Sequence, residues 1–208
     1  MSQMVLGLDE AGRGCVLGPL VVGAYFCDEA VLAELKVAGV TDSKALSAKR
    51  RVAFRALLPA HGTGRVLEVT PAQIDARNIN VLEEEMFIAH IVHFKPAAVF
   101  LDAPVHPRGI PRLKARMQQT LLRHGLSPTL LIEPKADLNY TVVGAASIYA
   151  KVYRDAHITA LGPVGSGYPS DPKTRAWLKG FFERDEPLPP CVRTRWATVE
   201  TLRQQALL

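Results

Sequence analysis

The 208-residue sequence predicts an α/β fold in which a mixed five-stranded sheet is flanked by helices and followed by a small C-terminal helical extension. Two observations predict this fold. Short runs rich in β-branched and aromatic residues come close together early in the chain and then alternate with segments of helical periodicity. Beyond about residue 163, Gly/Pro-rich loops separate two further helices. We therefore expect a main domain over residues 1–162 and an extension over residues 163–208 that packs on it.

Five segments have the composition of strands. The first two, residues 4–8 and 20–26, are joined by a short link, which favours an antiparallel hairpin. A third strand over residues 66–69 is closed by a Thr-Pro pair. The last two, residues 97–101 and 129–132, each follow a helix, and this alternation predicts parallel pairing.

The predicted helices begin and end at recognisable residues. Ser47 and Asn80 are in position to act as N-caps, and Gly125 follows a basic amphipathic segment as a C-terminal stop. The helices are expected over residues 48–58, 81–93, 112–124, 142–161, about 174–182 and from about 197.

Composition limits the class of protein. The net charge of +5 is compatible with a polyanionic partner, although a merely basic surface explains it equally well. The three cysteines, Cys15, Cys27 and Cys191, are an odd number at no metal-ligand spacing, which argues against a disulfide framework. The N-terminus lacks a signal-peptide pattern, and no apolar run has the length of a membrane span. We therefore expect a cytoplasmic protein with no membrane partner.

Carboxylates stand at the ends of the predicted strands. Asp9 and Asp102 each end an apolar strand, and Asp137 closely follows one. If the first and fourth strands are parallel neighbours, Asp9 and Asp102 lie side by side at the carboxyl edge of the sheet. Glu10 points to the other side unless a twist at the strand end brings it to the rim.

Carboxylates gathered without basic partners suit hard divalent cations such as Mg²⁺ or Mn²⁺. Two such ions, roughly 3.5–4 Å apart, would support in-line attack of water on a phosphodiester. Spacing alone leaves a second interpretation open, in which these residues are turn and cap residues.

A glycine-rich loop follows the first strand. Residues 12–14 and Gly18 spell G-x-G-x-x-x-G, which is close to a dinucleotide-binding fingerprint and makes a nicotinamide-dependent oxidoreductase a rival hypothesis. That fingerprint needs a helix at its second glycine, whereas strand-like sequence follows Pro19 here. The glycines instead allow the main chain to approach a ribose 2′-hydroxyl, or form only a tight turn.

Ordered blocks over nearly the whole chain resemble ribonuclease HII, the type 2 ribonuclease H family. The blocks are Asp-Glu-Ala-Gly-Arg-Gly (9–14), Gly-Pro-Leu-Val-Val (18–22), Thr-Asp-Ser-Lys (41–44), Asn-Ile-Asn (78–80) with Leu82, Lys-Ala-Asp (135–137), the helical block 145–155 and Gly-Ser-Gly-Tyr-Pro-Ser-Asp-Pro-Lys-Thr (165–174). The last block is similar to its form in archaeal and eukaryotic members. Near the C-terminus, Arg195 stands where the family pattern has serine.

The resemblance implies an RNase H-like catalytic domain over residues 1–162 and the helical extension over residues 163–208. It implies an endonuclease that hydrolyses the RNA strand of RNA–DNA hybrids and cuts 5′ to single ribonucleotides in duplex DNA. Two-metal hydrolysis with Mg²⁺ or Mn²⁺ would leave a 3′-hydroxyl and a 5′-phosphate. The implied catalytic and metal-binding set is Asp9, Glu10, Asp102 and Asp137.

The resemblance also implies a substrate-binding set. Its members are Gly12, Arg13, Gly14, Ser43, Lys44, Arg154 and Tyr168. The Gly-Arg-Gly segment would read the 2′-hydroxyl through its main chain. Tyr168 would stack on the sugar of the next deoxynucleotide. Phosphate contacts are expected from Lys44, Lys151, Arg154 and Lys173. For Lys151 and Arg154, an ion pair with Asp155 is an equal alternative.

Three rival hypotheses remain beside this one. They are another nuclease of the same fold that cuts DNA alone, the dinucleotide-dependent oxidoreductase, and a silent subunit that binds hybrids without cutting them. The expected partners are RNA–DNA hybrids and ribonucleotide-containing DNA, and the expected state is a monomer.

Overall fold

A computed structural model describes residues 3–40 and 43–206, apart from the side chain of Lys44. One sheet has the strand order β3-β2-β1-β4-β5, with β1 and β2 antiparallel, β2 and β3 antiparallel, and β1, β4 and β5 parallel. The strands are β1 Met4–Ala11, β2 Leu20–Asp28, β3 Thr63–Val69, β4 Ala98–Asp102 and β5 Thr129–Glu133. The predicted mixed α/β sheet, its hairpin and its parallel strands are confirmed.

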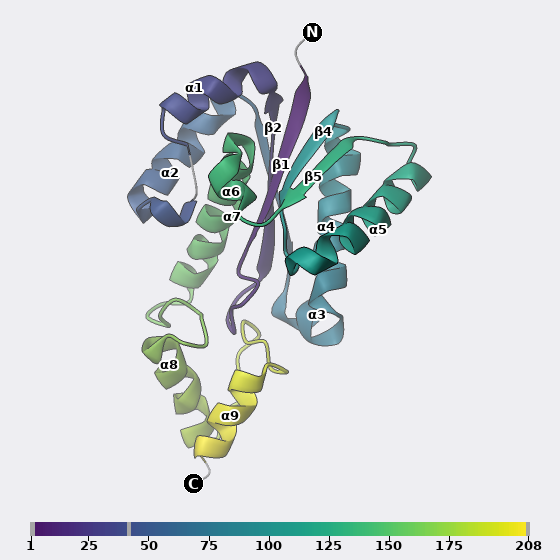
Figure 1. The fold of residues 1–208 in the computed structure, drawn as a ribbon. Coiled ribbons are helices and arrows are strands. Elements are labelled where there is room, and N and C mark those ends of the chain that lie inside the picture. The colour runs from purple at the N-terminus through teal and green to yellow at the C-terminus, as the bar shows by residue number, and fades with distance from the viewer. Residues whose placement is uncertain (1–2, 41–42, 207–208) are drawn as a thin grey trace.

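Helices cover both faces of this sheet (Figure 1). One face packs against α2 and α7, and the opposite face packs against α4 and α5. The helices are α1 Leu32–Val37, α2 Ala48–Leu57, α3 Pro71–Ala76, α4 Ile79–Phe94, α5 Ile110–Arg123, α6 Ala136–Asn139, α7 Thr141–Ala160, α8 Pro172–Glu183 and α9 Ala197–Ala206. In the described residues, no helix combines the length and the apolar character needed to cross a membrane.

Side chains along β1 alternate between the two faces, as the pleat of a strand requires. Leu6 and Leu8 belong to the core under α4 and α5, whereas Val5 belongs to the core under α7. Because β1 continues without a break through Glu10, Asp9 falls on the α7 side and Glu10 on the α4 side.

Helix α7 lies directly on the strands because two glycines leave room for it. A Cβ atom at Gly7 would stand 2.1 Å from the carbonyl oxygen of Val142, and one at Gly23 would stand 2.3 Å from that of Ala146. Real Cβ contacts are not this short, so only glycine allows the approach. This contact fixes the position of α7 beside the end of β1.

Several predicted boundaries were wrong. Strand β1 continues to Ala11 instead of ending before Asp9, because its pairing with β2 runs on to Val21. The N-cap of α4 is Asn78 and not Asn80, since the Asn78 side chain accepts the N–H of Asn80. The helices α1, α3 and α6 were not predicted, because they are too short to give a clear helical period.

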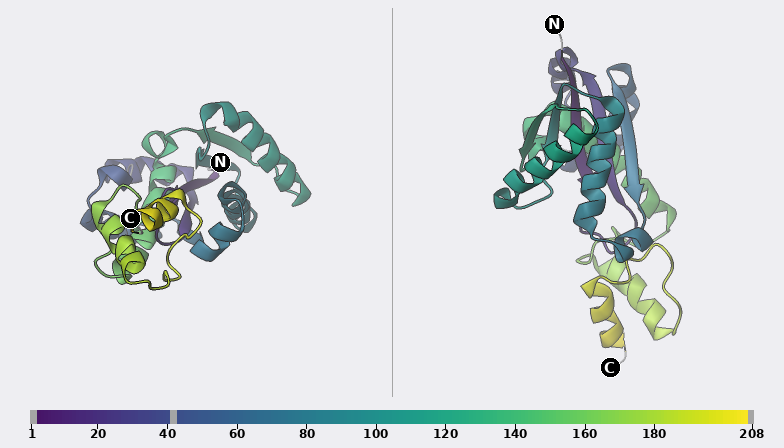
Figure 2. Two further views of the ribbon diagram at one scale, coloured as in Figure 1. Left: turned by 90° about the horizontal axis from the view of Figure 1, so that it is seen from below. Right: turned by 90° about the vertical axis from the view of Figure 1, so that its right-hand side faces the viewer.

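The C-terminal helices α8 and α9 continue below the sheet in Figure 1 and lie at the opposite end of the molecule from the N-terminus (Figures 1 and 2). Their apolar residues form a third core that also contains Val16, Leu17 and Ile158. Residues 17 and 192 form a backbone bridge. The extension is therefore joined to the loop after β1 and to the C-terminal part of α7.

Candidate active site

Three carboxylates meet at the carboxyl edge of the parallel strands. Leu8 of β1 pairs with Leu101 of β4, so the next residues, Asp9 and Asp102, are neighbours. One carboxylate oxygen from each of Asp9, Asp102 and Asp137 lies within 4.8 Å of the other two. Asp9 and Asp137 are buried and Asp102 is partly exposed. The prediction that Asp9 and Asp102 lie side by side is confirmed.

Asp137 reaches this group through a turn after β5. Lys135 adopts a left-handed conformation, with φ 59° and ψ 36°, and α6 begins at the next residue. The Asp102 carboxylate accepts a hydrogen bond of 3.0 Å from the Ala136 N–H. Asp102 therefore anchors the start of the short helix that carries Asp137 in its first turn.

Glu10 lies apart from the group of three, on the other face of the strand. The charges that act on it include those of Glu83 in α4, Asp102 and Arg13. In the described part of the chain, its Oε2 atom is buried and has no hydrogen-bond partner. The four predicted metal ligands are thus divided into a group of three and a nearby fourth.

The electrostatics of the site favour a bound cation. Burial raises the pKa of Asp9 well above its usual range, with the charges of Glu10, Asp102 and Asp137 adding to the effect and a Ser147 hydrogen bond opposing it. Burial raises the pKa of Glu10 to about 8, and the charges of Glu83 and Asp102 also raise it.

These carboxylates fit a hard divalent cation such as Mg²⁺ or Mn²⁺. They are oxygen ligands, they are close together, and a cation would supply the positive charge that their ionised forms lack. The unpartnered Oε2 of Glu10 is one further oxygen beside the group.

A cleft of 240 Å³ joins three of the four acidic residues, all but Asp137, to most of the predicted substrate-binding residues. Its lining comes from β1, the loop after β1, the segment before α2, β4, α7 and the loop before α8. The lining residues are Asp9, Glu10, Ala11, Gly12, Arg13, Gly14, Ser43, Asp102, Ser147, Lys151 and Tyr168. Most of the predicted site residues therefore lie in one place. The side chain of Lys44 lies outside the described residues.

The loop after β1 has a conformation that depends on glycine. Gly12 has φ +86°, and a Cβ there would stand 2.6 Å from the carbonyl oxygen of Pro19. A Cβ at Gly14 would face the ring of Tyr168 at 4.0 Å. The loop leads into β2 and not into a helix, so the requirement of the dinucleotide-binding fingerprint is not met.

The Arg13 side chain is held by α4, since its guanidinium forms an ion pair with Glu83 and a hydrogen bond with Asn80. Glu83 is almost fully buried. Burial raises the pKa of Glu83 to about 7, and the pairing with Arg13 opposes that rise. The Arg13 side chain is therefore engaged by residues of α4.

Tyr168 and Arg154 lie together at the other side of the loop. The Tyr168 side chain is partly exposed, and its ring lies 5.1 Å from the Arg154 guanidinium carbon. Arg154 is buried and donates to the Cys15 sulfur at 3.0 Å and to the Ser166 carbonyl at 2.5 Å. Arg154 is not among the residues that line the cleft, and its guanidinium lies 3.3 Å from the Asp155 carboxylate, which is the ion pair expected as the alternative to a phosphate contact.

Two polar residues of the site were missed by the sequence analysis. The first is Ser147, whose hydroxyl lies 2.7 Å from that of Ser43 and also hydrogen bonds to Asp9. The second is Glu83, described above. Lys151, an expected phosphate contact, lines the cleft and pairs with Asp155 at 2.5 Å. Ser147 lies four residues before Lys151 on one helix face, and this spacing is the signal that could have identified it.

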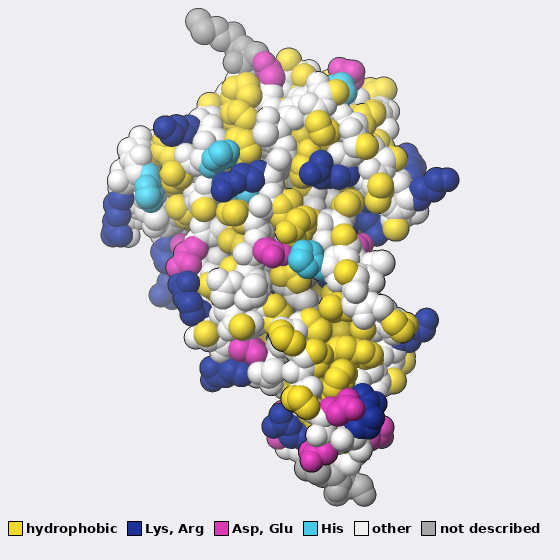
Figure 3. Space-filling view, turned by 180° about the vertical axis from the view of Figure 1, so that it is seen from behind, with side chains coloured by type: hydrophobic (Ala, Val, Ile, Leu, Met, Phe, Trp, Pro, Cys, Tyr) yellow, Lys and Arg dark blue, Asp and Glu magenta, His cyan; other side chains and the backbone are white. Residues whose placement is uncertain are grey.

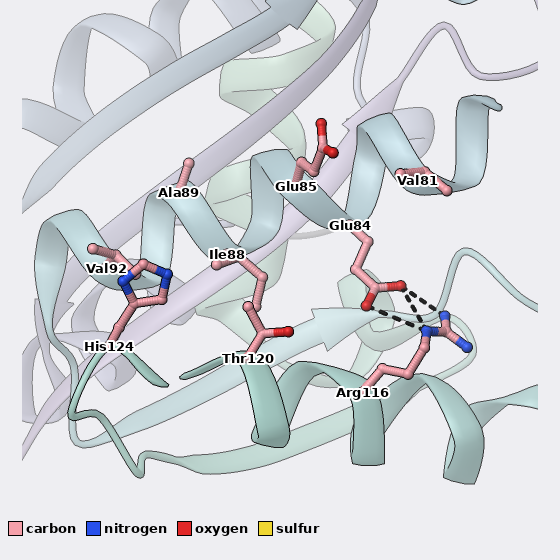
Figure 4. A pocket seen from close by; sticks show the side chains of 9 residues that line it. All are labelled: Val81, Glu84, Glu85, Ile88, Ala89, Val92, Arg116, Thr120 and His124. Atoms are coloured by element: carbon pink, nitrogen blue, oxygen red, sulfur yellow. Dashed lines mark hydrogen bonds and ion pairs between the residues drawn. The ribbon is translucent and has the colours of Figure 1, made fainter. Parts of the chain in front are cut away.

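A larger cavity of 580 Å³ lies between α4 and α5 (Figure 4). The apolar side chains of Val81, Ile88, Ala89 and Val92 line it together with polar ones, and an ion pair of 2.7 Å joins Glu84 to Arg116 across it. On the face seen from behind, Lys and Arg side chains are spread in separate groups (Figure 3). Asp9 and Asp102 line the smaller cleft and not this cavity.

The sequence and the fold are similar to those of known proteins. A model of the ribonuclease HII family matches residues 6–199. A ribonuclease HII of Pyrococcus horikoshii is 39% identical over 97% of this chain and 93% of its own length. The crystal structure of the ribonuclease H2 from Pyrococcus horikoshii OT3 is similar, with a TM-score of 0.86, 38% identity, and coverage of 98% of this chain and 99% of that one.

A second solved structure, the PCNA:RNase HII complex from Archaeoglobus fulgidus, is also similar. Its matching chain has a TM-score of 0.84 and 40% identity, and the match covers 96% of this chain and 97% of that one. The chain therefore belongs to the ribonuclease HII family and is a ribonuclease H, a nuclease of the hydrolase class.

Proposed function

We propose that this enzyme hydrolyses the RNA strand of RNA–DNA hybrids and cuts duplex DNA on the 5′ side of a single embedded ribonucleotide. Its family supports endonuclease action on RNA–DNA substrates. The observation that carries the finer proposal is one cleft in which the carboxylates of Asp9 and Asp102 lie beside the Gly-Arg-Gly loop and Tyr168.

Asp9, Glu10, Asp102 and Asp137 would hold the metal ions. Two divalent cations bound there would activate the attacking water and stabilise the leaving 3′-oxygen. The Ser147 hydroxyl holds Asp9 in place by a hydrogen bond, and the hydrogen bond between Asp102 and Ala136 holds α6 beside it. Cleavage in this direction leaves a 3′-hydroxyl and a 5′-phosphate.

Selection for ribose would come from the other end of the cleft. The glycines at 12 and 14 carry no side chain, so the main chain of the loop is free to approach a 2′-hydroxyl. The partly exposed ring of Tyr168 faces Gly14, where it would stack on the sugar of the following deoxynucleotide. Ser43 and Lys151, which line the cleft, would contact the substrate backbone.

The test is a gel assay on an end-labelled DNA duplex that carries one ribonucleotide, with Mg²⁺, with Mn²⁺ and with EDTA. We expect a metal-dependent nick 5′ to the ribonucleotide and none in an all-DNA duplex of the same sequence. Asp102→Asn, purified in parallel, controls for contaminating nucleases. Equal cutting of the all-DNA duplex would instead indicate a nuclease that ignores ribose, and binding without cutting would indicate a silent hybrid-binding protein.

A further inference from the structure

Arg193, in the segment between α8 and α9, reaches the Gly-Arg-Gly loop from the far end of the chain. Its side chain is fully buried. Its guanidinium donates three hydrogen bonds to main-chain carbonyls of the loop after β1. They are Nη2 to Gly12 at 2.6 Å, Nη1 to Arg13 at 3.0 Å and Nε to Gly18 at 3.1 Å.

The main chain of the same segment pairs with the same loop. The Arg193 N–H donates to the Val16 carbonyl at 2.9 Å, and the Gly18 N–H donates to the Cys191 carbonyl at 2.8 Å. Together with the bridge between Leu17 and residue 192, these bonds form a short antiparallel pairing. The guanidinium is therefore held in a fixed position relative to the loop.

The orientation of the carbonyls determines the orientation of the amide N–H groups. A trans peptide is planar, and its C=O and N–H point in opposite directions. When Arg193 binds the carbonyls of Gly12 and Arg13, the N–H groups of Arg13 and Gly14 must point away from Arg193. Arg13 and Gly14 line the cleft. A cation on the carbonyls also polarises these amides and makes their N–H groups stronger donors.

We propose that Arg193 is a positioning residue for ribose selection, whose guanidinium sets the two peptide planes of the Gly-Arg-Gly loop so that their N–H groups meet the 2′-hydroxyl. This inference rests on the proposed function, and it assigns the C-terminal segment a part in specificity. A lysine at this position keeps the positive charge, but its ammonium group lacks the planar set of N–H donors with which the guanidinium binds three carbonyls.

The test measures binding, so that it does not depend on turnover. Fluorescence anisotropy with Ca²⁺ gives the Kd for a labelled duplex with one ribonucleotide and for the all-DNA duplex of the same sequence, and a gel confirms that the probes stay intact. The variants are Arg193→Gln and Arg193→Lys. The matched control is Arg195→Gln, because the Arg195 guanidinium donates to the Asp75 carbonyl at 2.9 Å and not to the loop.

The measured quantity is the Kd for the all-DNA duplex divided by the Kd for the ribonucleotide duplex. We expect this ratio to fall about tenfold in Arg193→Gln, which is the scale of one lost or misplaced hydrogen bond. The loss should fall on the ribonucleotide duplex, with the all-DNA Kd unchanged. Arg193→Lys should lie between this variant and the wild type, and Arg195→Gln should keep the wild-type ratio. Circular dichroism checks folding, and if Arg193→Gln does not fold, Arg193→Lys carries the test.

Two results would overturn the inference alone: a wild-type ratio in a folded Arg193 variant, or an equal weakening of both Kd values, which indicates only structural support. A wild-type protein with a ratio of one would overturn the proposed function, and this inference with it. The two failures are therefore distinguishable.

Discussion

At the scale of single residues, neighbouring carboxylates have different surroundings because they lie on opposite faces of one strand. Asp9 hydrogen bonds to Ser147 on the α7 side, whereas Glu10 lies near Glu83 on the α4 side. Burial raises the pKa of both groups. The site therefore holds acidic side chains in an arrangement that is unfavourable without a cation.

Asp9→Asn should separate activity from stability. We expect cleavage to fall by roughly a thousandfold or more, because an amide is a poor ligand for the cations that would activate water. The metal-free Tm should not fall, because asparagine removes a buried charge and keeps a hydrogen-bonding oxygen for Ser147. Gel assays and thermal melts in EDTA measure the two effects.

Glu183→Gln on α8 is the control for that experiment, since its carboxylate forms an exposed ion pair with Lys179. It should leave both activity and Tm unchanged. Cleavage by Asp9→Asn at the wild-type rate would remove Asp9 from the catalytic set.

At the scale of elements, the contact of α7 with the sheet places the polar residues of the helix at the site. Gly23 of β2 lies under Ala146, one residue before Ser147, and Ala150 is the next contact along the helix. The absence of a side chain at Gly23 therefore determines how closely α7 approaches the sheet beside Asp9.

Gly23→Ala should destabilise the protein and reduce activity together. The added Cβ would stand 2.3 Å from the Ala146 carbonyl oxygen, so α7 must shift away from the sheet. We expect a loss of about 1–3 kcal/mol in urea unfolding, and a lower kcat because Ser147 moves relative to Asp9. Gly109→Ala is the control: its Cβ would lie 3.6 Å from Val105, and we expect a change within about 0.5 kcal/mol. An unchanged stability in Gly23→Ala would contradict the role given to this contact.

At the scale of the whole molecule, the extension shares a core with the loop after β1 and with α7. We propose that residues 163–208 are an extension that folds with residues 1–162 and not alone. The third core supports this, because Val16, Leu17 and Ile158 are packed with residues of α8 and α9. A calorimetric melt should therefore contain one cooperative transition, and two separate transitions would contradict the proposal.

The stability of the metal-free protein should fall as pH rises from 6.5 to 8. The pKa of Glu10 is raised from 4.5 to about 8 and that of Glu83 to about 7, so the folded state binds protons that the unfolded state has released. His90, whose pKa burial lowers to about 4, acts in the opposite direction but only below about pH 6.5. Above pH 6.5, Glu10 and Glu83 therefore determine how stability changes with pH.

Thermal melts in EDTA and in millimolar Mg²⁺ test this expectation. Bound cations favour the ionised carboxylates, so Mg²⁺ should raise Tm and reduce the pH slope. A Tm in EDTA that rises between pH 6.5 and 8 would mean that these carboxylates are not protonated in the folded state.

The sequence by itself determined the strands, the hairpin and the meeting of Asp9 with Asp102. These features follow from local periodicity and from the rule that parallel strands end at one edge. The segment after Gly14 was also interpreted correctly as strand and not helix, from its β-branched residues.

Only the tertiary structure decided the rest of the site. Asp137 arrives through a left-handed turn at Lys135, which no periodicity encodes. Arg193 contacts Arg13 across 180 residues of chain, and Ser43 meets Ser147 across 104. Such contacts depend on how whole elements pack, and a local pattern reports only which face of its own element a residue occupies.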